Sequence, residues 1–579
     1  MMQLFKNARL AGSSVRQQLT DDPVILFLQI SRRLPAAVMP LAKRLCRWAP
    51  RDSAATVVLF AALAAGDNAD VERRLRLAAA NSIGGEHARH LADIALAANL
   101  PVLSDGFLAK AGGAQRLKQT RARRLWHDGS ITGAVEALTG SGTAGLRQQS
   151  RLAAEAAVLQ DASPSLERRP YAPVPGRILH LLTNSLPHTA SGYAQRSHST
   201  LLAQQEAGFE VLAVTRMGYP VMVGKLLAKA ADTVDGVRYL RLLPAKMAPT
   251  TDARLQQQAE ELLAVALEFK PSVLQTTTHY VNGLVVRAVA EALGIPWVYE
   301  VRGQLADTWA STRGPEALSS EKYRLFKDRE TEVMQDADLV LTLGEAMKAN
   351  IVAAGIPEKK VLLAPNAVGG DYLSDPLDTA SARRELGLAE DGQFIGTVSS
   401  LVAYEGIDDL LAAFVLLAPD MPGLRLLIVG DGSARPSLEI QALRSGYADR
   451  VIFTGRVPRS HAALYHRALD VFVVPRKDLD VTRSVTPLKP VEAMACARPV
   501  VASDLPALAE IVEDRVTGFL AAAGQPAAFA AAIRALLADS QLAAEFGSAG
   551  RQRVLRDRTW AANAVALARE LEMLGVTIK

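Results

Sequence analysis

The sequence predicts an α/β protein with two doubly wound parallel sheets in tandem and an all-helical appendage before them. Three observations carry this prediction: two series of short β-branched segments, amphipathic segments of helix length between their members, and a proline-rich break before the first series. With 579 residues, 49% of them apolar, the chain is long enough for several cores. We expect five parts in chain order. They are a basic amphipathic helical segment (1–50), the helical appendage (51–165), the first sheet domain (176–365), the second sheet domain (366–555) and a C-terminal helix that packs back across the domains (556–579).

The two series of strands have similar lengths and spacing. A parallel sheet with helices on both faces gives such an alternation. The first series is 177–183, 210–215, 272–277, 297–303, 338–344 and 360–365, and the second is 393–400, 424–432, 450–457, 470–475, 498–504 and 518–522. Because ligands of open α/β sheets bind beyond the carboxyl ends of the strands, we expect the active site in a cleft between the two sheets.

The segment before the sheets is helical in pattern. Residues 51–165 place Ala, Leu, Arg and Glu at helical spacing, without a clear strand or a repeating period. Four prolines in residues 162–177 then mark a boundary.

The first 50 residues are the basic part of the chain. They hold eight basic and two acidic residues, so their balance of +6 (8 − 2) exceeds the +5 of the whole chain. Because residues 23–48 also mix apolar with basic side chains, this segment could lie on an anionic membrane surface. A helical segment that docks a partner, or that buries its apolar side in the core, explains the same pattern. Basic and aromatic residues are not interleaved elsewhere, so we expect no nucleic-acid partner.

Cysteine and hydropathy patterns bear on the compartment. With Cys46 and Cys496 alone, the sequence has neither a disulfide framework nor a cysteine-based metal site. The longest apolar run, 54–65, is shorter than the roughly 20 residues of a membrane-spanning helix, and no signal-peptide pattern opens the chain. We expect a cytoplasmic protein, with residues 1–50 as a possible peripheral contact to the inner face of the cell membrane.

A lysine and a glutamate stand one turn apart at a helix start in the second sheet region. Thr486, Pro487 and Leu488 lead into Lys489, and Glu492 follows three positions later. Free N–H groups and the lysine would suit a diphosphate, and the carboxylate could accept both hydroxyls of a ribose. An ordinary surface ion pair at this spacing is the alternative. The glycine turn Gly430, Asp431 and Gly432, where a strand meets a helix, could approach the same ligand or be only a tight turn.

Five motifs in sequence order give a resemblance to a known family. They are "PNAV", "GTVSSLVAYEGIDDLLAAF", "LLIVGDGS", "VIFTGRVPRSHAALYHRALDVFVVPR" and "PLKPVEAMACARPVVASDLPALAEIVEDRVTGFL". Together they closely resemble the retaining glycosyltransferases of family 4, which have the GT-B fold of two Rossmann-like domains, and among them members with a Pro-x-Lys-x-x-Glu helix start. The resemblance covers roughly 176–570 and is strong over 362–520.

The resemblance implies that the second sheet holds a nucleotide-sugar donor. It places Gly455, Arg456 and Val457 beside the base and Glu492 at the ribose. Two family positions differ: Ser484 stands where a first glutamate is expected, and Glu405 stands where a lysine precedes the glycine in "AYEG". We therefore assign the diphosphate contact to Lys489, with Arg476 or Arg483 as a second cation.

The first sheet is expected to receive the acceptor. Ser191, Gly192 and Tyr193 resemble the family's glycine-bearing loop near the donor phosphates, and His279 occupies a position where relatives often carry a histidine beside the reacting sugar. A structural histidine explains the residue equally well, and a salt-bridged surface arginine would explain Arg196. The acceptor-side candidates are Arg196, Asn282, Glu300 and Arg302.

The resemblance implies transfer of a sugar from a nucleoside diphosphate sugar to a hydroxyl acceptor, with retention of configuration. We expect a saccharide or lipid-linked acceptor and a role in polysaccharide or glycoconjugate biosynthesis. Lys489, Glu492 and His279 are the expected catalytic set. No cofactor or metal is expected, because helix dipoles and basic side chains balance the leaving diphosphate; Asp478–Asp480 and Asp336–Asp338 only copy a metal motif. The alternatives are a nucleotide-sugar epimerase of this fold, a non-catalytic scaffold that has lost activity with Ser484 and Glu405, and a peripheral membrane structural protein.

Overall fold

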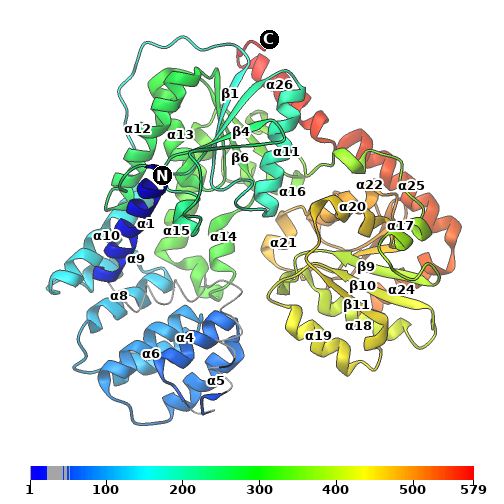
Figure 1. The fold of residues 1–579 in the computed structure, drawn as a ribbon, viewed down its shortest axis with the longest axis horizontal. Coiled ribbons are helices and arrows are strands. Elements are labelled where there is room, and N and C mark those ends of the chain that lie inside the picture. The colour runs from blue at the N-terminus through cyan, green and yellow to red at the C-terminus, as the bar shows by residue number, and fades with distance from the viewer. Residues whose placement is uncertain (1, 22–43, 45–47, 51–52, 579) are drawn as a thin grey trace.

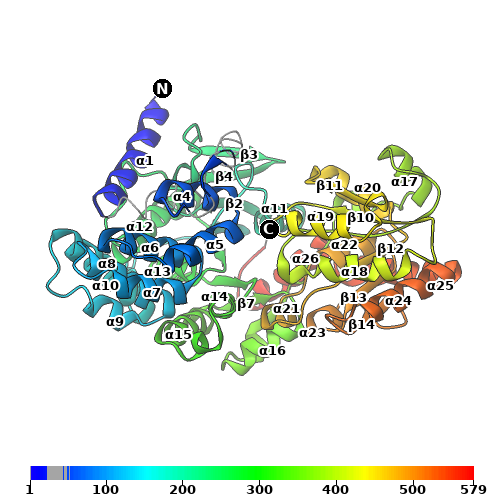
Figure 2. The same ribbon diagram turned by 90° about the horizontal axis from the view of Figure 1, so that it is seen from below.

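The protein has three parts: a stack of helices, a first sheet domain and a second sheet domain (Figure 1). The computed structural model describes residues 2–21, 44, 48–50 and 53–578. Most of the basic segment expected over 1–50 lies outside these residues, and Cys46 lies outside them as well. The described portion of the basic segment includes helix α1 (Met2–Asp21). This helix lies on the side of the first sheet domain that faces away from the second (Figure 2).

The helical appendage has two small cores. One lies among its first four helices and includes Leu75, Leu91 and Phe107, all fully buried, and the other includes Ala122 and Leu138. Hydrogen bonds join the appendage to the first sheet domain: Thr132 N donates to the Glu321 side chain at Oε2 (2.8 Å), and Lys322 N donates to Gly129 O (2.9 Å). Its helices are α4 (Thr56–Ala65), α5 (Asn68–Ala79), α6 (Gly85–Ala97), α7 (Pro101–Lys110), α8 (Leu117–Asp128), α9 (Ile131–Glu136) and α10 (Thr143–Gln160).

The first sheet has eight strands in the order β3-β4-β2-β1-β5-β6-β7-β8. All its pairs are parallel except β3 with β4, a hairpin that the sequence pattern did not indicate, because its two strands are short and partly polar. The hairpin turns at Asp235 and Gly236, both with positive φ. The strands are β1 (Arg177–Leu182), β2 (Glu210–Thr215), β3 (Ala231–Val234), β4 (Val237–Arg241), β5 (Val273–Thr277), β6 (Trp297–Val301), β7 (Leu339–Thr342) and β8 (Val361–Leu363).

Helices cover both faces of the first sheet. α10, α12, α13 and α15 contribute to the core on one face, and α11 and α26 to the core on the other, which explains why β5 and β6 are buried along their whole length. The elements of this domain are α11 (Gly192–Glu206), α12 (Thr251–Phe269), α13 (Tyr280–Leu293), α14 (Leu305–Ala310), α15 (Glu321–Asp336) and α16 (Glu345–Ala353), with the short 3-10 turns η2 (Val221–Val223), η3 (Pro315–Ser319) and η4 (Glu358–Lys360).

The second sheet has six parallel strands in the order β11-β10-β9-β12-β13-β14. They are β9 (Gln393–Val398), β10 (Leu424–Val429), β11 (Val451–Gly455), β12 (Val471–Val474), β13 (Val500–Ser503) and β14 (Gly518–Ala521). Its helices are α17 (Thr379–Glu385), α18 (Ile407–Leu417), α19 (Arg435–Arg444), α20 (Arg459–Arg467), α21 (Asp480–Ser484), α22 (Lys489–Ala495), α23 (Pro506–Ala509), α24 (Pro526–Ala538) and α25 (Ser540–Asp557), with η5 (Gly370–Tyr372), η6 (Ala403–Glu405) and η7 (Ala448–Arg450).

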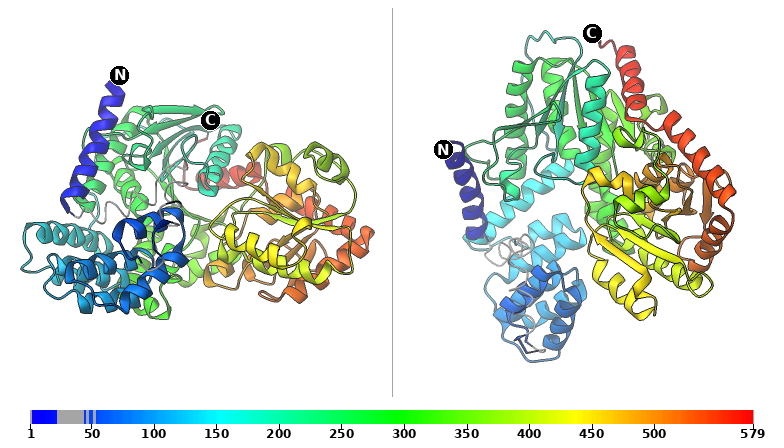
Figure 3. Two further views of the ribbon diagram at one scale, coloured as in Figure 1. Left: turned by 60° about the horizontal axis from the view of Figure 1, so that its bottom comes forward. Right: turned by 45° about the vertical axis from the view of Figure 1, so that its right-hand side comes forward.

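The chain crosses between the two domains twice. After β8 it enters the second domain, and helix α26 (Trp560–Met573) returns to lie against α11 (Figures 1 and 3). Asn563 Nδ2 then donates to Pro365 O (2.9 Å), so the two crossings touch. The predicted fold class, two parallel Rossmann-like sheets with an added helical part, is confirmed.

The helices differ in length and hydropathy from membrane-spanning helices. Within the described ranges, no single helix is both long and apolar enough to cross a bilayer. One pair bent by 103°, Pro526–Ala538 with Ser540–Asp557, meets the length and composition criteria only when its two helices are taken together.

Candidate active site

Three stretches predicted for donor binding lie along the carboxyl edge of the second sheet. The turns after β10 and β11 are side by side, because Gly430 N donates to Gly455 O (3.0 Å). The third stretch, Thr486 to Glu492, follows β12 and contains the start of α22. In the turn after β11, Arg456 is exposed and Val457 is half-buried. This part of the sheet edge therefore offers both a cation and an apolar surface.

The glycines after β10 have a structural reason of their own. Gly430 has φ of 136°, and a Cβ there would lie 1.8 Å from Ser399 O. A Cβ on Gly432 would lie 2.2 Å from Leu401 O. Both therefore let this turn pack against the loop after β9. Asp431 between them is exposed and accepts a hydrogen bond from Gly432 N (2.9 Å); contact of this turn with a ligand stays a prediction.

Lys489 pairs with Glu405, the residue that stands in place of the expected lysine. Lys489 Nζ lies 2.8 Å from Glu405 Oε1, and Arg476 Nη2 lies 3.1 Å from the same oxygen. Arg476 also donates to Val485 O (2.9 Å), which lies just before the helix start. Glu405 is 3% exposed, whereas 22% of the Lys489 side chain is accessible.

The charge of this cluster follows from its ion pairs. Burial raises the pKa of Glu405, but Lys489 and Arg476 outweigh it and lower that pKa to about 2. Burial lowers the pKa of Lys489, and Glu405 opposes this effect. With one carboxylate between two cations, the cluster has a net charge of +1 (2 − 1). An anion at the start of α22 would meet these two cations, with the Glu492 carboxylate, which also acts electrostatically on Lys489, one turn further on.

The other candidates near Lys489 point elsewhere. Arg483 is exposed and forms an ion pair with Asp478, so Arg476 is the second cation beside the lysine. Ser484 Oγ donates to Asp480 O (3.0 Å). Among the described residues, no group of three or more His, Cys, Asp or Glu side chains is arranged to hold a metal ion.

Glu492 lines a hollow between the two domains. The hollow has a volume of about 570 Å³, and its lining includes Leu488 and Arg459 of the second domain and Gln195 and Glu206 of the first. Arg459 crosses the gap: it donates to Ser199 Oγ (3.2 Å) and contacts Gln195. Because Glu492 lines a hollow of this volume, a ligand bound in the hollow could contact its carboxylate.

Sequence reasoning missed His466, which lies beneath Glu492. Its Nε2 is 3.7 Å from Glu492 Oε2, and the side chain is fully buried against Phe472. Neither ring nitrogen has a hydrogen-bond partner among the described residues. The sequence signal was a histidine inside the apolar repeat of α20, which by itself predicts only a core residue.

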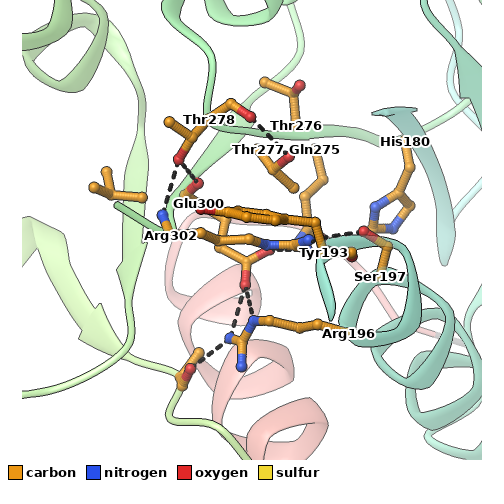
Figure 4. Close-up of polar contacts among 12 residues, drawn as sticks. His180, Tyr193, Arg196, Ser197, Gln275, Thr276, Thr277, Thr278, Glu300 and Arg302 are labelled. Atoms are coloured by element: carbon orange, nitrogen blue, oxygen red, sulfur yellow. Dashed lines mark hydrogen bonds and ion pairs between the residues drawn. The ribbon is translucent and has the colours of Figure 1, made fainter. Parts of the chain in front are cut away.

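On the first sheet, three acceptor-side candidates form a buried ion cluster. Figure 4 shows Arg196 and Arg302 reaching Glu300 from two sides: Arg196 Nε donates to Oε1 (2.7 Å) and Arg302 Nη2 donates to Oε2 (2.6 Å). The three residues are 6%, 3% and 1% exposed. Burial raises the pKa of Glu300, but Arg302 and Arg196 outweigh it and lower it to about 2. These side chains support the sheet edge and are not open to an acceptor here.

Asn366 joins this cluster to the donor side. Its Oδ1 accepts from Arg196 Nη1 (3.1 Å), and its Nδ2 donates to Thr486 O (2.8 Å). A chain of contacts therefore runs from Glu300 through Arg196 and Asn366 to the backbone before Lys489. The asparagine belongs to the motif "PNAV", whose local pattern indicated no role for it.

The loop before α11 faces the second domain. Ser191 Oγ accepts from Ala194 N (3.3 Å) and caps the helix. Tyr193 is 49% exposed, and its carbonyl oxygen accepts from Arg302 Nη1 (3.0 Å). Tyr404 precedes Glu405 in the second domain, and its pKa is raised, mainly by burial and then by Glu405. Tyr193 makes a smaller contribution to this rise, so its phenol lies near Tyr404.

His279 and Asn282 have local structural contacts. His279 Nδ1 accepts from Val281 N (3.4 Å) at the start of α13, and its ring stacks on Phe326 at 5.4 Å between centroids. Burial, with a smaller effect of Arg216, lowers the pKa of His279 to about 4, so it is neutral at pH 7. Asn282 is buried and donates to Thr183 Oγ1 (2.8 Å). A role of either residue toward a sugar stays a prediction.

A cleft between two parallel sheets, with a basic cluster and a carboxylate on the second, defines the GT-B class of fold. Residues 191–367 match the family described as "Glycosyl transferase 4-like domain", and residues 378–553 match the family described as "Glycosyl transferases group 1". The two sheet domains belong to these glycosyltransferase families.

Similar proteins agree with this class. The chain is 31% identical over 281 residues to a D-inositol 3-phosphate glycosyltransferase of Segniliparus rotundus, covering 47% of this chain and 60% of the relative. It is 32% identical over 236 residues to a GDP-mannose-dependent alpha-(1-6)-phosphatidylinositol monomannoside mannosyltransferase of Mycolicibacterium smegmatis, covering 40% and 62%. The chain thus spans about three fifths of these curated relatives.

Two solved structures show the same fold. Sucrose-phosphate synthase of Thermosynechococcus elongatus has a TM-score of 0.56 at 22% identity, covering 69% of this chain and 99% of that one. HepE of Anabaena, solved in complex with UDP, has a TM-score of 0.54 at 19% identity, covering 69% and 100%.

Proposed function

We propose that the protein is a retaining glycosyltransferase that moves a sugar from a nucleoside diphosphate sugar to a hydroxyl acceptor, in polysaccharide or glycoconjugate biosynthesis. The observation that carries this proposal is the net positive cluster of Lys489, Arg476 and Glu405 at the start of α22, with Glu492 one turn further on in the hollow between the domains. The proposed mechanism needs no metal ion or other cofactor.

Charge stabilisation is the main catalytic effect in this proposal. The leaving diphosphate gains negative charge as the bond to the sugar breaks, and a preorganised cation in a site with little water lowers the energy of that charge most. Glu405 holds the ammonium of Lys489 and the guanidinium of Arg476 in place before the donor arrives. The Lys489 ammonium is then set at the leaving group without a reorganisation step, and Arg476, which is buried, adds positive charge to the cluster.

Glu492 is the proposed ribose contact. A carboxylate can accept hydrogen bonds from two hydroxyls, and this one has accessible space in front of it. Gly455, Arg456 and Val457 are proposed beside the base. The printed name of one relative specifies GDP-mannose and one structural neighbour was solved with UDP; both are nucleotides with a ribose diol and a diphosphate.

The acceptor is proposed to be a saccharide or a lipid-linked molecule that approaches from the first sheet, past Tyr193. Relatives named for inositol phosphate and phosphatidylinositol mannoside support a hydroxyl acceptor on a polar head. In this proposal, as the family resemblance implies, the acceptor attacks from the face that the diphosphate leaves, and the leaving phosphate takes the acceptor's proton. We place the protein in the cytoplasm, with residues 1–50 as a peripheral contact to the inner face of the membrane.

Two other functions make different demands on the same site. An epimerase would need additional carboxylates near the reacting sugar carbon, and the carboxylates of Glu300 and Glu405 are both held in buried ion pairs. A non-catalytic scaffold would have no need of the Glu492 carboxylate in a hollow, one turn from the ion cluster of Lys489.

A donor panel tests the proposed function. The full chain is incubated with UDP-, GDP-, ADP- and dTDP-sugars and with saccharide or phosphatidylinositol acceptors, and the released nucleoside diphosphate is measured by mass spectrometry. We expect one donor class to give acceptor-dependent release and a product with the donor's anomeric configuration. A product of inverted configuration would contradict the retaining mechanism but not the transferase activity. If no donor is bound and none releases its nucleoside diphosphate, the transferase proposal itself is contradicted.

A further inference from the structure

Exposed apolar side chains are concentrated where α1 meets the segment after β2. Leu227 is 83% exposed and Phe5 is 70% exposed, and Leu4, Leu226 and Val223 are 45%, 44% and 38% exposed. They come from two stretches more than 200 residues apart in the sequence, so neither stretch alone indicates this surface.

The two stretches are held together by specific contacts. Asn7 Nδ2 donates to both Leu226 O and Ala228 O at 2.8 Å. Leu10, fully buried, packs in one cluster with Val221 and Ala228. The face of α1 that carries Asn7 and Leu10 is therefore fixed to the domain. Phe5, two positions from Asn7 on the helix, points away from that contact.

The charge around these apolar side chains has one sign. Residues 2–13 and 216–230 contain five basic residues and no acidic residue. Lys6 and Arg9 on α1 and Lys225 and Lys229 beside the leucines are exposed. Leucine or phenylalanine surrounded by lysine and arginine is the composition of segments that lie in the headgroup region of anionic bilayers. Lysine is depleted in protein interfaces, so a protein partner fits this surface less well.

We propose that these residues form a docking surface for an anionic lipid bilayer, here called the α1 surface: Leu4, Phe5, Lys6, Arg9, Val223, Lys225, Leu226, Leu227 and Lys229. Apolar side chains would enter the headgroup region while the four cations meet anionic headgroups. This proposal extends the membrane contact proposed for residues 1–50 to a second segment of the chain. It does not depend on the donor residues.

The position of the surface is compatible with transfer to a lipid-linked acceptor. α1 lies on the side of the first sheet domain away from the second, so a bilayer there leaves the cleft between the domains open (Figures 2 and 3). The segment 216–230 also contacts the loop before Ser191, because Tyr219 Oη lies within hydrogen-bond distance of Ser185 O and of Thr189 Oγ1, at 2.8 Å from each. Ser185 and Thr189 lie in the loop that leads to Ser191.

Vesicle sedimentation tests the proposal with the full chain. The probes are vesicles of phosphatidylcholine alone and vesicles that also contain phosphatidylglycerol, at low and high salt. The variants are Leu227→Asp and Lys225→Glu. Their matched controls are Val102→Asp, which changes an 80% exposed apolar residue on α7, and Lys359→Glu, which changes an exposed lysine far along the chain.

We expect binding to the anionic vesicles that weakens at high salt. Neutralising one lysine near a membrane surface costs about five-fold in affinity, and Lys225→Glu should cost at least that much. Leu227→Asp should reduce binding further, and neither control should change it. Binding equal for all four variants, or no binding of the parent chain, would overturn the proposal. A third outcome would also overturn the proposal: the parent chain does not bind vesicles but forms concentration-dependent dimers, and Leu227→Asp dissociates them. The surface would then be assigned to a second copy of the chain.

The variants also separate this proposal from the donor assignment. All four should keep the parent's melting temperature and its response to nucleoside diphosphates, because they lie outside the candidate active site. A loss of vesicle binding with an unchanged nucleotide response therefore concerns the α1 surface alone.

Discussion

Lys489 Nζ lies 2.8 Å from Glu405 Oε1, so the lysine predicted to contact a diphosphate already has a buried counterion. In the family that the sequence resembles, the position of Glu405 usually carries a lysine. The exchange of that lysine for a glutamate is accompanied here by an ion cluster in which one carboxylate holds two cations. The departure from the family pattern is therefore part of an ordered site.

Glu405→Gln tests the role of this counterion. The change leaves Lys489 and Arg476 facing each other without a carboxylate, and breaking a buried ion pair by removing one partner costs about 3–5 kcal/mol. We expect a lower melting temperature and a larger stabilisation by the cognate nucleoside diphosphate, since the diphosphate replaces the lost charge. Asp478→Asn, which removes the partner of exposed Arg483, is the control and should change the melting temperature little. Equal responses of the two variants to nucleotide would contradict this role.

Asn366→Ala tests the link between the two sheets. The variant loses the hydrogen bond to Thr486 O and the contact with Arg196, which should destabilise the protein by about 1–3 kcal/mol and misplace the start of α22. Nucleotide affinity, measured by calorimetry, should fall. Asn563→Ala removes a bond to Pro365 O in the same linker but touches nothing on the donor side, so its affinity should be unchanged. A normal affinity in Asn366→Ala would show that the link is not needed for the site.

Glu492→Ala tests the ribose contact. Loss of a carboxylate that accepts two hydroxyls should weaken binding of the nucleoside diphosphate by roughly ten-fold or more, and should leave binding of its 2′-deoxy analogue less affected. The ratio of the two dissociation constants is the readout. Glu206→Ala, which changes another glutamate lining the same hollow, should preserve that ratio. If Glu206→Ala alters the ratio and Glu492→Ala does not, the ribose lies on the other wall.

Glu330 predicts a pH dependence of stability. Its carboxylate accepts from Leu305 N (3.0 Å) at the start of α14, and burial raises its pKa from 4.5 to about 7. Between these values the native protein binds more protons than the unfolded chain, so the free energy of unfolding falls as pH rises from 4.5 to about 7. The loss is on the order of 3 kcal/mol. Glu330→Gln should abolish this part of the slope in melting temperature against pH, and an identical slope in both proteins would contradict it.

The sequence predicted the two sheets well because both are made of buried parallel strands. Such strands read as β-branched runs between helices, as 339–342 and 471–474 do. It did not predict the hairpin of β3 and β4, which lies at the sheet edge and has only a few apolar residues.

The candidate site was predicted in part. Glycine turns and the helix start after Thr486 are local patterns, so a single sequence shows them. The pairing of Lys489 with Glu405, and the position of His466 under Glu492, depend on which strands become neighbours, and no local pattern carries that information. Arg196, Glu300 and Arg302 were named as separate candidates, and only the fold shows that they form one buried cluster.

The most direct test of the account is a thermal-shift panel of UDP, GDP, ADP, dTDP and CMP on the parent chain, on Lys489→Ala and on Lys477→Ala. Lys477 pairs with Asp408 and Asp409 and serves as a nearby control. A ligand present at 100 times its dissociation constant stabilises the native state by about 2.7 kcal/mol. The account predicts that one nucleoside diphosphate raises the melting temperature of the parent and of Lys477→Ala but not of Lys489→Ala. No shift with any nucleotide, or an equal shift in all three proteins, would contradict it.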